Sequence, residues 1–223
     1  MKKRYLLLAS LSAALLSGCA NQSTPYDYSA LQSSNPKSIL LVLPQNNSPE
    51  VKADVAVLAQ ATMPLAENGY YVFPVTLVNE LFKENGVTNG NDIQSINTKK
   101  LHQIFGADAV MYMTVDEYGS SYRVLDSVTT VSATAKLVDL KSGQTLWSGS
   151  ARIATRDNQN QNGGVLGSLL AAVVNQIINT VTDKGYKVAG QTTAQLFNTG
   201  HNGNILYGPK HPLYKKDPQL QTK

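Results

Sequence analysis

A short apolar run near the start of the chain constrains the fold more than any other feature. Residues Ser38–Leu43 read SILLVL, and Pro44 ends the run. A continuous apolar run of this length, without alternation, predicts a strand that is buried on both faces. Such strands belong to sheets that carry helices on both sides, so we expect the first half of the chain to form an α/β unit.

The chain alternates between helix and strand after this run. Apolar residues at helical spacing predict helices at Glu50–Asn68 and at about Thr76–Asn85, separated by a short buried strand at Tyr70–Pro74. Val87–Asn97 has the composition of a turn, and Thr98–Phe105 predicts another short helix. Because strands and helices alternate, neighbouring strands are expected to be parallel, with right-handed crossovers.

The second half of the chain predicts an antiparallel meander. Strands are expected at Ala109–Val115, Tyr122–Asp139 and Thr145–Ile153, joined by turns at Tyr118–Ser121 and Asp139–Gln144. The whole pattern predicts an α/β fold with a single mixed sheet of about five strands. The sheet is parallel in its first half and an antiparallel meander in its second half, with helices packed on it.

The amino terminus has the three parts of a lipoprotein signal peptide. Met1–Arg4 is basic, Tyr5–Leu16 is apolar, and a Leu-Ser-Gly-Cys sequence then ends at Cys19. At ~1.5 Å per residue, the apolar part is too short to span ~30 Å of hydrocarbon. The final four residues resemble the bacterial lipobox, in which the chain is cleaved after Gly18 and the cysteine sulfur takes a diacylglyceryl group. The alternative is an ordinary signal peptide followed by a buried cysteine.

Acylation of Cys19 would hold the chain on a membrane without a spanning helix. Two or more acyl chains, palmitate among them, anchor a protein stably to a bilayer. Ala20 stands where aspartate commonly retains lipoproteins in the inner membrane, so the resemblance points to the outer membrane, with the globular part in the periplasm. Asn21–Lys37 is polar, contains two prolines and has no periodicity, so we expect a flexible tether.

Charge and cysteine content exclude several classes of protein. The chain of 223 residues has a formal net charge of +4, but Lys2, Lys3 and Arg4 lie in the signal peptide. Removal of these three from the 19 basic residues leaves 16 against 15 acidic ones, a net charge of +1. That balance argues against nucleic acid as a partner. A single cysteine excludes an intramolecular disulfide framework and zinc sites built from several thiolates.

The expected domain organisation has four parts. They are a signal peptide at 1–18, the lipidated cysteine and tether at 19–37, an α/β domain at 38–198, and a tail at 199–223 that is rich in Gly, Pro, Tyr and Lys. The α/β domain is expected to end in a short helix at Val188–Phe197. The tail is not expected to form a packed element of its own.

The segment Val165–Val181 predicts a helix with two apolar stripes. Its apolar arc is much wider than the roughly 100° that one packing face needs. We expect the second stripe to contact another copy of the chain, as a homodimer, or a partner protein. The candidate interface residues are Leu170, Val174, Ile178 and Val181. Two alternatives are that Tyr186–Tyr214 covers this stripe within one monomer, or that the helix spans a membrane.

The titratable residues predict neither a metal site nor an acid–base pair. Asp116 and Glu117 are adjacent on a strand, so their side chains point to opposite faces unless the strand bulges. Three or four ligands must converge to hold a metal ion. No ligand at metal-binding spacing accompanies any of the three histidines, which are His102, His201 and His211.

The remaining candidates for chemistry have plainer structural roles. Ser148 and Ser168 do not lie in the G-x-S-x-G sequence of a nucleophile elbow, and Gly163–Gly167 lacks the lysine of a phosphate-binding loop. We therefore expect no catalytic residues and no cofactor. The only tryptophan, Trp147, is expected in the core, and an interface position is the alternative.

Four motifs between about Lys37 and Tyr214 resemble those of a family of bacterial envelope lipoproteins of unknown function, which includes a neisserial surface antigen. They are LLVLPQNNSPEVKA, FGADAVMYMTV, ATAKLVDLKSGQTLWSGSA and NILYGPKHPLY. More distantly, the pattern is similar to the TolB amino-terminal domain, CsgG and LpoB. The resemblance implies a periplasm-facing α/β domain that acts through protein contacts, often beside a CsgG-like lipoprotein, and it supplies no catalytic residues.

These observations predict a lipid-anchored, non-enzymatic subunit or accessory protein of an outer-membrane or periplasmic assembly related to secretion or transport. One alternative is a periplasmic module that binds a small ligand or associates with peptidoglycan. Another is an envelope hydrolase. The wide apolar arc of Val165–Val181 favours the first function, whereas convergent polar groups in a deep pocket would favour the others.

Overall fold

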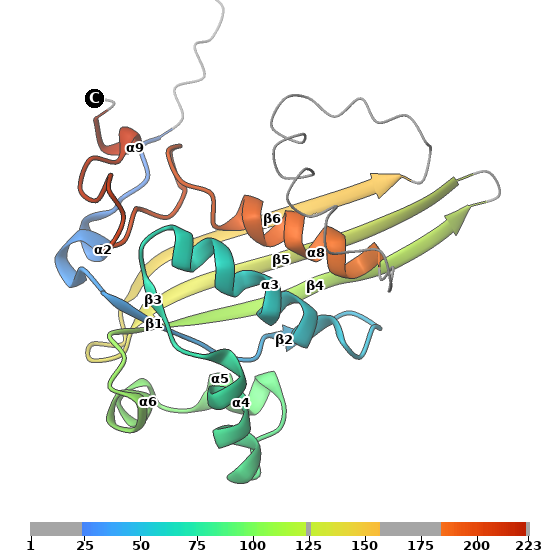
Figure 1. The fold of residues 1–223 in the computed structure, drawn as a ribbon, viewed down its shortest axis with the longest axis horizontal. Helices are drawn as coiled ribbons and strands as arrows, with labels where there is room; N and C mark the ends of the chain where they lie inside the picture. The colour runs from blue at the N-terminus through green and yellow to red at the C-terminus, as the bar shows by residue number, and fades with distance from the viewer. Residues whose placement is uncertain (1–23, 124–125, 157–183, 222–223) are drawn as a thin grey trace, which may run out of the picture.

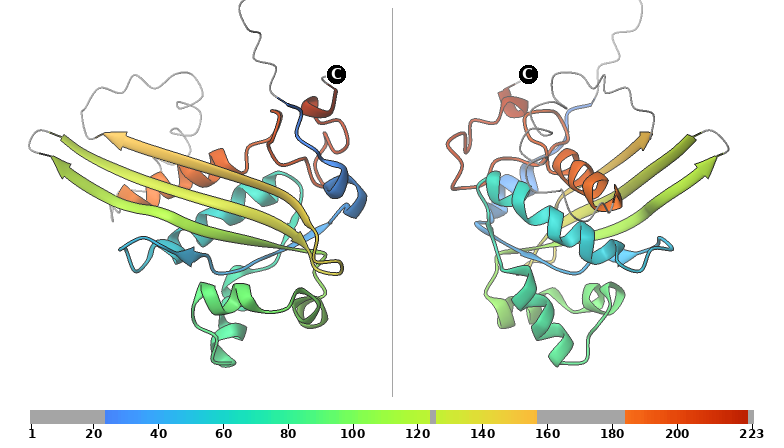
Figure 2. Two further views of the ribbon diagram at one scale, coloured as in Figure 1. Left: turned by 180° about the vertical axis from the view of Figure 1, so that it is seen from behind. Right: turned by 45° about the vertical axis from the view of Figure 1, so that its right-hand side comes forward.

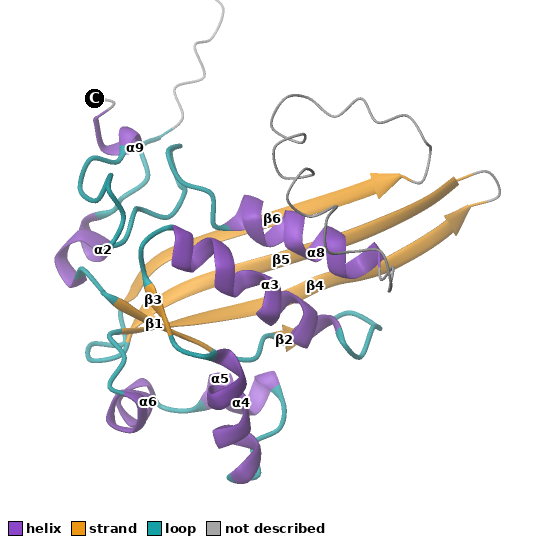
Figure 3. Cartoon of the chain, viewed as in Figure 1, coloured by secondary structure: helices purple, strands orange, loops and turns teal. Residues whose placement is uncertain are grey.

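The computed structural model describes residues 24–123, 126–156 and 184–221. Its helices and strands are shown in Figures 1 and 3. In chain order they are α2 Ser29–Ser34, β1 Ser38–Leu41, β2 Gln45–Asn46, α3 Ala53–Glu67, β3 Tyr71–Val72, α4 Val75–Glu84, α5 Gly90–Ser95, α6 Thr98–Phe105, β4 Ala109–Arg123, β5 Asp126–Asp139, β6 Thr145–Arg156, α8 Lys184–Leu196 and α9 Pro218–Gln221.

The strands form one mixed sheet in the order β3-β1-β4-β5-β6, with β2 paired to β4 as a sixth strand. The pairs β1–β3, β1–β4 and β2–β4 are parallel, and β4–β5 and β5–β6 are antiparallel. The predicted fold class is therefore confirmed. The additional strand, β2, has two residues, Gln45 and Asn46, which are too few to show alternation in a sequence.

The core lies between the sheet and the helices α3 and α8, which lie side by side on one face (Figure 2). Ile39, Leu40 and Leu41 of β1 have no exposed surface, as expected for a strand buried on both faces. The long strands β4, β5 and β6 are different, because described helices cover only one of their faces (Figure 2). On β5, Ala133 is buried toward α8 and Thr134 is exposed on the open face.

Two local predictions are wrong. A turn was expected at Tyr118–Ser121, but β4 runs through it to Arg123 and pairs with β5 along its whole length. Tyr118 is buried there although it is three residues after the buried Val115, because a register shift between Val115 and Glu117 returns it to the covered face. Val87–Asn97 was expected to be a turn, but it contains α5, whose cap Asn89 accepts the N–H of Asp92 (2.9 Å).

The two polar ends of the described chain are also packed, in contrast to the prediction for 19–37 and 199–223. In the first, α2 forms and Tyr28 and Leu31 are buried. In the second, Ile205 and Leu206 are buried and α9 forms. The packed body therefore extends beyond 38–198 on both sides. The apolar residues of these two segments are scattered among polar ones, so they show no helical or strand periodicity in the sequence. They are buried because the two segments pack on each other.

Candidate functional site

The two end segments, Thr24–Lys37 and Thr199–Gln221, form one structure that we call the clasp. Asn202 joins them: its Oδ1 accepts the N–H of Tyr26 (2.7 Å), and its Nδ2 donates to the carbonyl of Thr24 (3.0 Å). The hydroxyl of Tyr28 donates to the carbonyl of Asn204 (2.7 Å). The first described residues are thus held against a segment about 176 positions later in the chain.

The clasp is also attached to the edge of the sheet. The indole N–H of Trp147 in β6 donates to the carbonyl of Gly203 (2.9 Å), and the N–H of Ser148 donates to the hydroxyl of Tyr26 (3.0 Å). Trp147 is 1% exposed, which confirms the prediction of a core position. A buried tryptophan needs a partner for its N–H, and the clasp supplies it.

Hydrogen bonds from the family motif NILYGPKHPLY attach the clasp to the turn between α3 and β3. Gly208 N–H donates to the carbonyl of Asn68 (2.7 Å), and Lys210 N–H donates to that of Gly69 (3.0 Å). The hydroxyl of Tyr70 donates to the carbonyl of Leu206 (2.8 Å). Gly69 has a φ of 88°, and a Cβ there would overlap the backbone of His211, so this position requires glycine.

Asp217 is the buried acid of the clasp. It is 1% exposed, and its carboxylate accepts the N–H of Tyr207 (2.7 Å). Burial raises the pKa of Asp217, and the hydrogen bond from Tyr207 opposes that shift without cancelling it. Burial also raises the pKa of Tyr70.

A pocket of about 270 Å³ opens between the two segments of the clasp. The hydroxyl of Tyr214 hydrogen-bonds Asn35 across it. Both polar and apolar side chains line the pocket. Those lining residues are Leu31, Gln32, Asn35, Pro36, Tyr70, Leu206, Tyr207, Pro209, Tyr214, Lys215, Asp217 and Leu220.

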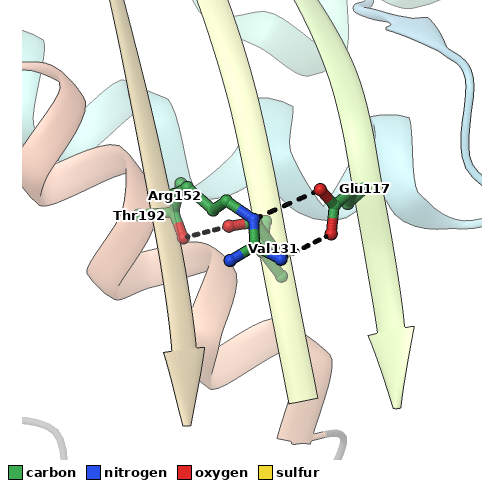
Figure 4. A network of polar contacts seen from close by, with 4 residues as sticks. All are labelled: Glu117, Val131, Arg152 and Thr192. Atoms are coloured by element: carbon green, nitrogen blue, oxygen red, sulfur yellow. Dashed lines mark hydrogen bonds and ion pairs between the residues drawn. The ribbon is translucent and has the colours of Figure 1, made fainter. Parts of the chain in front are cut away.

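A second polar feature lies on the open face of the sheet (Figure 4). Arg152 of β6 donates two hydrogen bonds to Glu117 of β4 (3.2 and 3.0 Å) across Ser132 of the central strand. The hydrogen bond from Arg152 lowers the pKa of Glu117. On the covered side, the hydroxyl of Thr192 donates to the carbonyl of Val131 (3.3 Å).

Asp116 and Glu117 lie at an irregularity of strand β4. The register of β4 shifts between Val115 and Glu117, so the strand does bulge and Asp116 is the extra residue. Burial raises the pKa of Asp116, and the charge of Glu117 adds to the shift. Glu117 is engaged by Arg152 instead of by its neighbour.

The three histidines occupy separate places. His102 is half-exposed, and its Nδ1 lies 2.8 Å from the carbonyl of Ala107. The ring of His211 stacks on Tyr207 at 3.9 Å, and His201 is exposed in the clasp. Histidine, cysteine and acidic side chains of the described ranges nowhere gather in threes as a metal ion would require.

Several predicted residues lie outside the described ranges, namely Gly18, Cys19, Gly163–Gly167, Ser168, Leu170, Val174, Ile178 and Val181. The described chain leaves β6 at Arg156, which pairs with Val128, and resumes at Lys184. Next to Lys184, Gly185 packs against the ring of Tyr118. Arg156 therefore lies near the hairpin end of the sheet, whereas Gly185 lies farther from it, beside Tyr118, five residues before β4 ends at Arg123. Within the described residues no helix is both long and apolar enough to cross a membrane.

Asn202 and Asp217 are the site residues that sequence reasoning missed. The only signal was their position beside the family motif NILYGPKHPLY, because Asn202 stands just before it and Asp217 just after it. Spacing alone does not distinguish such a polar residue from a solvated one.

Comparison with known proteins agrees with the motifs. The family model described as "Putative lipoprotein GNA1162-like" matches residues 26–210. "Putative lipoprotein NMB1124/NMB1162" of Neisseria meningitidis serogroup B is 52% identical over 211 residues, which cover 94% of this chain and 97% of that protein. The crystal structure of lipoprotein GNA1162 from Neisseria meningitidis is similar with a TM-score of 0.55 and 58% identity, covering 65% of this chain and all of that one.

A solved structure of the LpoB C-terminal domain from Escherichia coli is a more distant neighbour. It has 16% identity and a TM-score of 0.38, over 54% of this chain and 85% of that one. The similarities to TolB and CsgG stay predictions from the sequence. The family match covers most of the chain, and it includes both the sheet and most of the clasp. The chain therefore belongs to the GNA1162-like lipoprotein family.

Proposed function

We propose that the protein is a lipid-anchored, non-enzymatic subunit of an outer-membrane or periplasmic assembly, and that it acts through protein contacts. The observation that carries this proposal is the outer edge of β6. This strand has twelve residues and is the last in the sheet. The clasp bonds its outer side at Ser148, and no described strand pairs with that side. Long unpaired edges are templates for strand addition, and proteins normally shorten or cover them unless they are used.

The open face of the sheet extends this surface. Toward the β6 edge it includes the exposed or half-exposed Ser132, Thr134, Ser150 and Ala154 with the Arg152–Glu117 pair across them. Most side chains in this part of the face are short, and the ion pair joins two of the longer ones across the central strand. A flat, ordered surface beside a free edge suits a protein partner better than a small molecule, which needs a concave site.

The anchor in this proposal is Cys19, exposed by cleavage after Gly18. The family's lipoprotein name and the lipobox-like sequence support it. Palmitate among the attached chains, the outer membrane as location and the periplasm as the compartment of the globular part follow from the same sequence argument.

The proposed interface for a homodimer is the stripe of Leu170, Val174, Ile178 and Val181. Its support is the width of the apolar arc in the sequence. The described residue before that segment, Arg156, pairs with Val128 near the hairpin end of the sheet, and Gly185 after it packs against Tyr118 of β4. A CsgG-like lipoprotein as a further partner rests on the sequence resemblance alone, because the relatives and structures reported above name no such partner.

Photocrosslinking in intact cells tests the protein-contact function. A photoreactive amino acid replaces Ala154 on the open edge or, as the control, Leu77 on α4, which is 69% exposed. We expect discrete protein adducts from position 154, identified by pull-down and mass spectrometry, and none of the same mass from position 77. Absence of adducts at 154, or the same adducts at both positions, would contradict the proposal.

The second candidate function is a ligand-binding or peptidoglycan-associated module, which the pocket in the clasp favours. Tyr70, Tyr207, Tyr214 and Lys215 bring hydroxyl and ammonium groups to its wall. Isothermal titration with soluble peptidoglycan fragments tests it. Saturable binding that Tyr214→Phe weakens would support a ligand-binding module, and heat signals equal to buffer dilution would contradict it.

A further inference from the structure

The proposed lipid anchor and the clasp together determine which end of the molecule lies on the membrane. Thr24 is fixed by its hydrogen bond to Asn202. Only five residue steps separate it from Cys19. A chain spans at most about 3.3–3.6 Å per residue, so the reach from the lipidated residue to Thr24 is about 18 Å or less. The clasp therefore cannot leave the neighbourhood of the bilayer.

The hairpin end of the sheet is much farther from the anchor. Asp139, at one end of β5, hydrogen-bonds Ser34 of α2 (2.6 Å), so that end of the strand touches the clasp. The other end, Asp126, lies thirteen residues away along an extended strand, or about 43 Å at ~3.3 Å per residue. Figure 1 shows the hairpin and the clasp at opposite ends of the sheet.

The clasp has the surface chemistry of a headgroup contact. Its two segments carry four lysines and two aspartates, and one of the aspartates, Asp217, is buried. Lys210, Lys215 and Lys216 are exposed within seven residues of one another. Lysines near a bilayer are attracted to anionic lipid within a Debye length of about 8 Å at physiological salt.

An apolar side chain stands among these lysines. Leu213 is 43% exposed, between Lys210 and Lys215 in the chain. Tyr207 and Tyr214, which flank it, are half-buried. Tyrosine and lysine side chains with an apolar body and a polar tip are favoured at the boundary between headgroups and acyl chains.

We propose that the segment Lys210–Lys216 rests on the anionic phospholipid surface to which the anchor is attached, with the lysine ammonium groups on headgroup phosphates and Leu213 at the acyl boundary. This inference rests on the proposed lipidation of Cys19. It holds the hairpin and the open part of the β6 edge away from the bilayer, where a partner protein can reach them.

Fluorescence quenching in proteoliposomes tests the orientation. The lipidated full-length protein has one cysteine, whose sulfur is blocked by its lipid, so a cysteine introduced elsewhere is the only free thiol. The label is placed at Leu213→Cys or, as controls, at Leu77→Cys on α4 and at Ala154→Cys, which is exposed on β6 toward the hairpin end. The vesicles contain phosphatidylglycerol and a lipid that carries a quencher on its headgroup.

We expect strong quenching at position 213 and little at positions 77 and 154. Equal quenching at 213 and at either control position would overturn the proposal, because the molecule would then lie flat or tumble freely. Flotation of the vesicles is measured on the same samples. Protein that fails to float with them contradicts the anchor itself, whereas protein that floats without selective quenching at 213 contradicts only the orientation.

The contribution of charge is tested with a matched pair of double variants. Lys215→Glu with Lys216→Glu reverses two adjacent exposed lysines in the clasp, and Lys99→Glu with Lys100→Glu does the same on α6. We expect the clasp variant to reduce the docked population by about tenfold and the α6 variant to leave it unchanged. Equal effects of the two variants, or undiminished quenching at 213 in purely phosphatidylcholine vesicles, would overturn the role of anionic lipid.

Discussion

Asn202 connects the first described residues of the chain to the carboxy-terminal segment with a single side chain. Asn202→Ala removes both of its hydrogen bonds, to Tyr26 and Thr24. We expect the free energy of unfolding to fall by about 1 kcal/mol, because the site is exposed and each bond contributes modestly. Urea denaturation measures the change.

The control for that prediction is Asn204→Ala. Asn204 takes part in the clasp through its carbonyl, which accepts the Tyr28 hydroxyl, and alanine keeps this carbonyl. An equal loss of stability in both variants would contradict the role given to the Asn202 side chain.

Asp217 makes the stability of the clasp depend on pH. Burial raises its pKa above the ordinary value of 3.8, so the folded state favours the protonated acid. The resulting stabilisation is fully present below pH 3.8 and is lost as pH rises through the folded-state pKa. Asp217→Asn keeps an oxygen acceptor for the Tyr207 N–H and cannot ionise.

We therefore expect Asp217→Asn to gain stability relative to the natural chain as the pH rises from 3 to 7. Urea denaturation at several pH values measures the difference in the free energy of unfolding between the two proteins. Both proteins contain the other carboxylates, so the contributions of those groups cancel in the difference. Asp217→Ala leaves the Tyr207 N–H without its acceptor. We expect this variant to be less stable than the natural chain at pH 3 and at pH 7. A difference between Asp217→Asn and the natural chain that stays constant with pH would show that burial of the acid has no cost.

The backbone carbonyl of Gly69 accepts a hydrogen bond from Lys210 in the family motif NILYGPKHPLY. Gly69→Ala places a Cβ on the backbone of His211 and forces a non-glycine residue to a φ of 88°. Gly86→Ala has the same type of conformation, with a φ of 77°, but meets no atom within 4 Å. We expect Gly86→Ala to cost about 1 kcal/mol of stability and Gly69→Ala at least about 2 kcal/mol more. Equal costs in denaturation experiments would mean that the motif does not pack tightly on this turn.

The edge strand β6 is the element on which the proposed function depends. The N–H of Ser148 points away from β5, and the register continues unshifted from Ser148 to Arg156, so the N–H of Ala154 points outward too. Ala154→Pro removes an outward donor and should leave the β5–β6 ladder intact. We expect this variant to fold and to lose the adducts of a photoreactive group placed at Ser150.

Ile153→Pro is the matched control on the same strand, because its N–H faces β5. It should cost about 3 kcal/mol or more, since it removes a bond within the ladder. Unchanged adducts from a folded Ala154→Pro variant would contradict strand pairing at this edge.

Elements with their own local signals could be predicted from the sequence. The helix Thr98–Phe105 was predicted with the bounds that the structure gives. In the structure, Asn97 caps its start, and Gly106, with a φ of 67°, follows its end. Elements stabilised by distant contacts could not be predicted. The N-cap of α2, Tyr28, makes no side-chain cap hydrogen bond, and the buried Leu31 of this helix packs in the hydrophobic core.

The candidate site was predictable only in part. Trp147 could be placed in the core because it follows an alternating strand. The pocket and the clasp could not, because they need Asn35 beside Tyr214 and Thr24 beside Asn202, pairs about 180 residues apart. Whether β4 bulges at Asp116 could not be predicted, because one extra residue in a strand does not alter the composition of the segment.

At the scale of the whole molecule, the sheet separates two surfaces. The clasp, with the chain that leads to Cys19, lies at one end, and the hairpin of β4 and β5 lies at the other (Figure 1). A protein held on a membrane by one end can present the other to partners at a fixed distance. The rigid three-stranded part of the sheet provides that distance, because its strands are paired along nearly their whole length.

Metabolic labelling with palmitate is the most direct measurement of the central claim, which is that Cys19 anchors the protein to a membrane. The natural chain and Cys19→Ala are expressed in cells grown with labelled palmitate, and the membranes are fractionated. The account predicts a labelled, membrane-bound natural protein and an unlabelled Cys19→Ala variant that is soluble or remains an uncleaved precursor. Unchanged labelling of Cys19→Ala, or a natural chain that takes up no label, would contradict it.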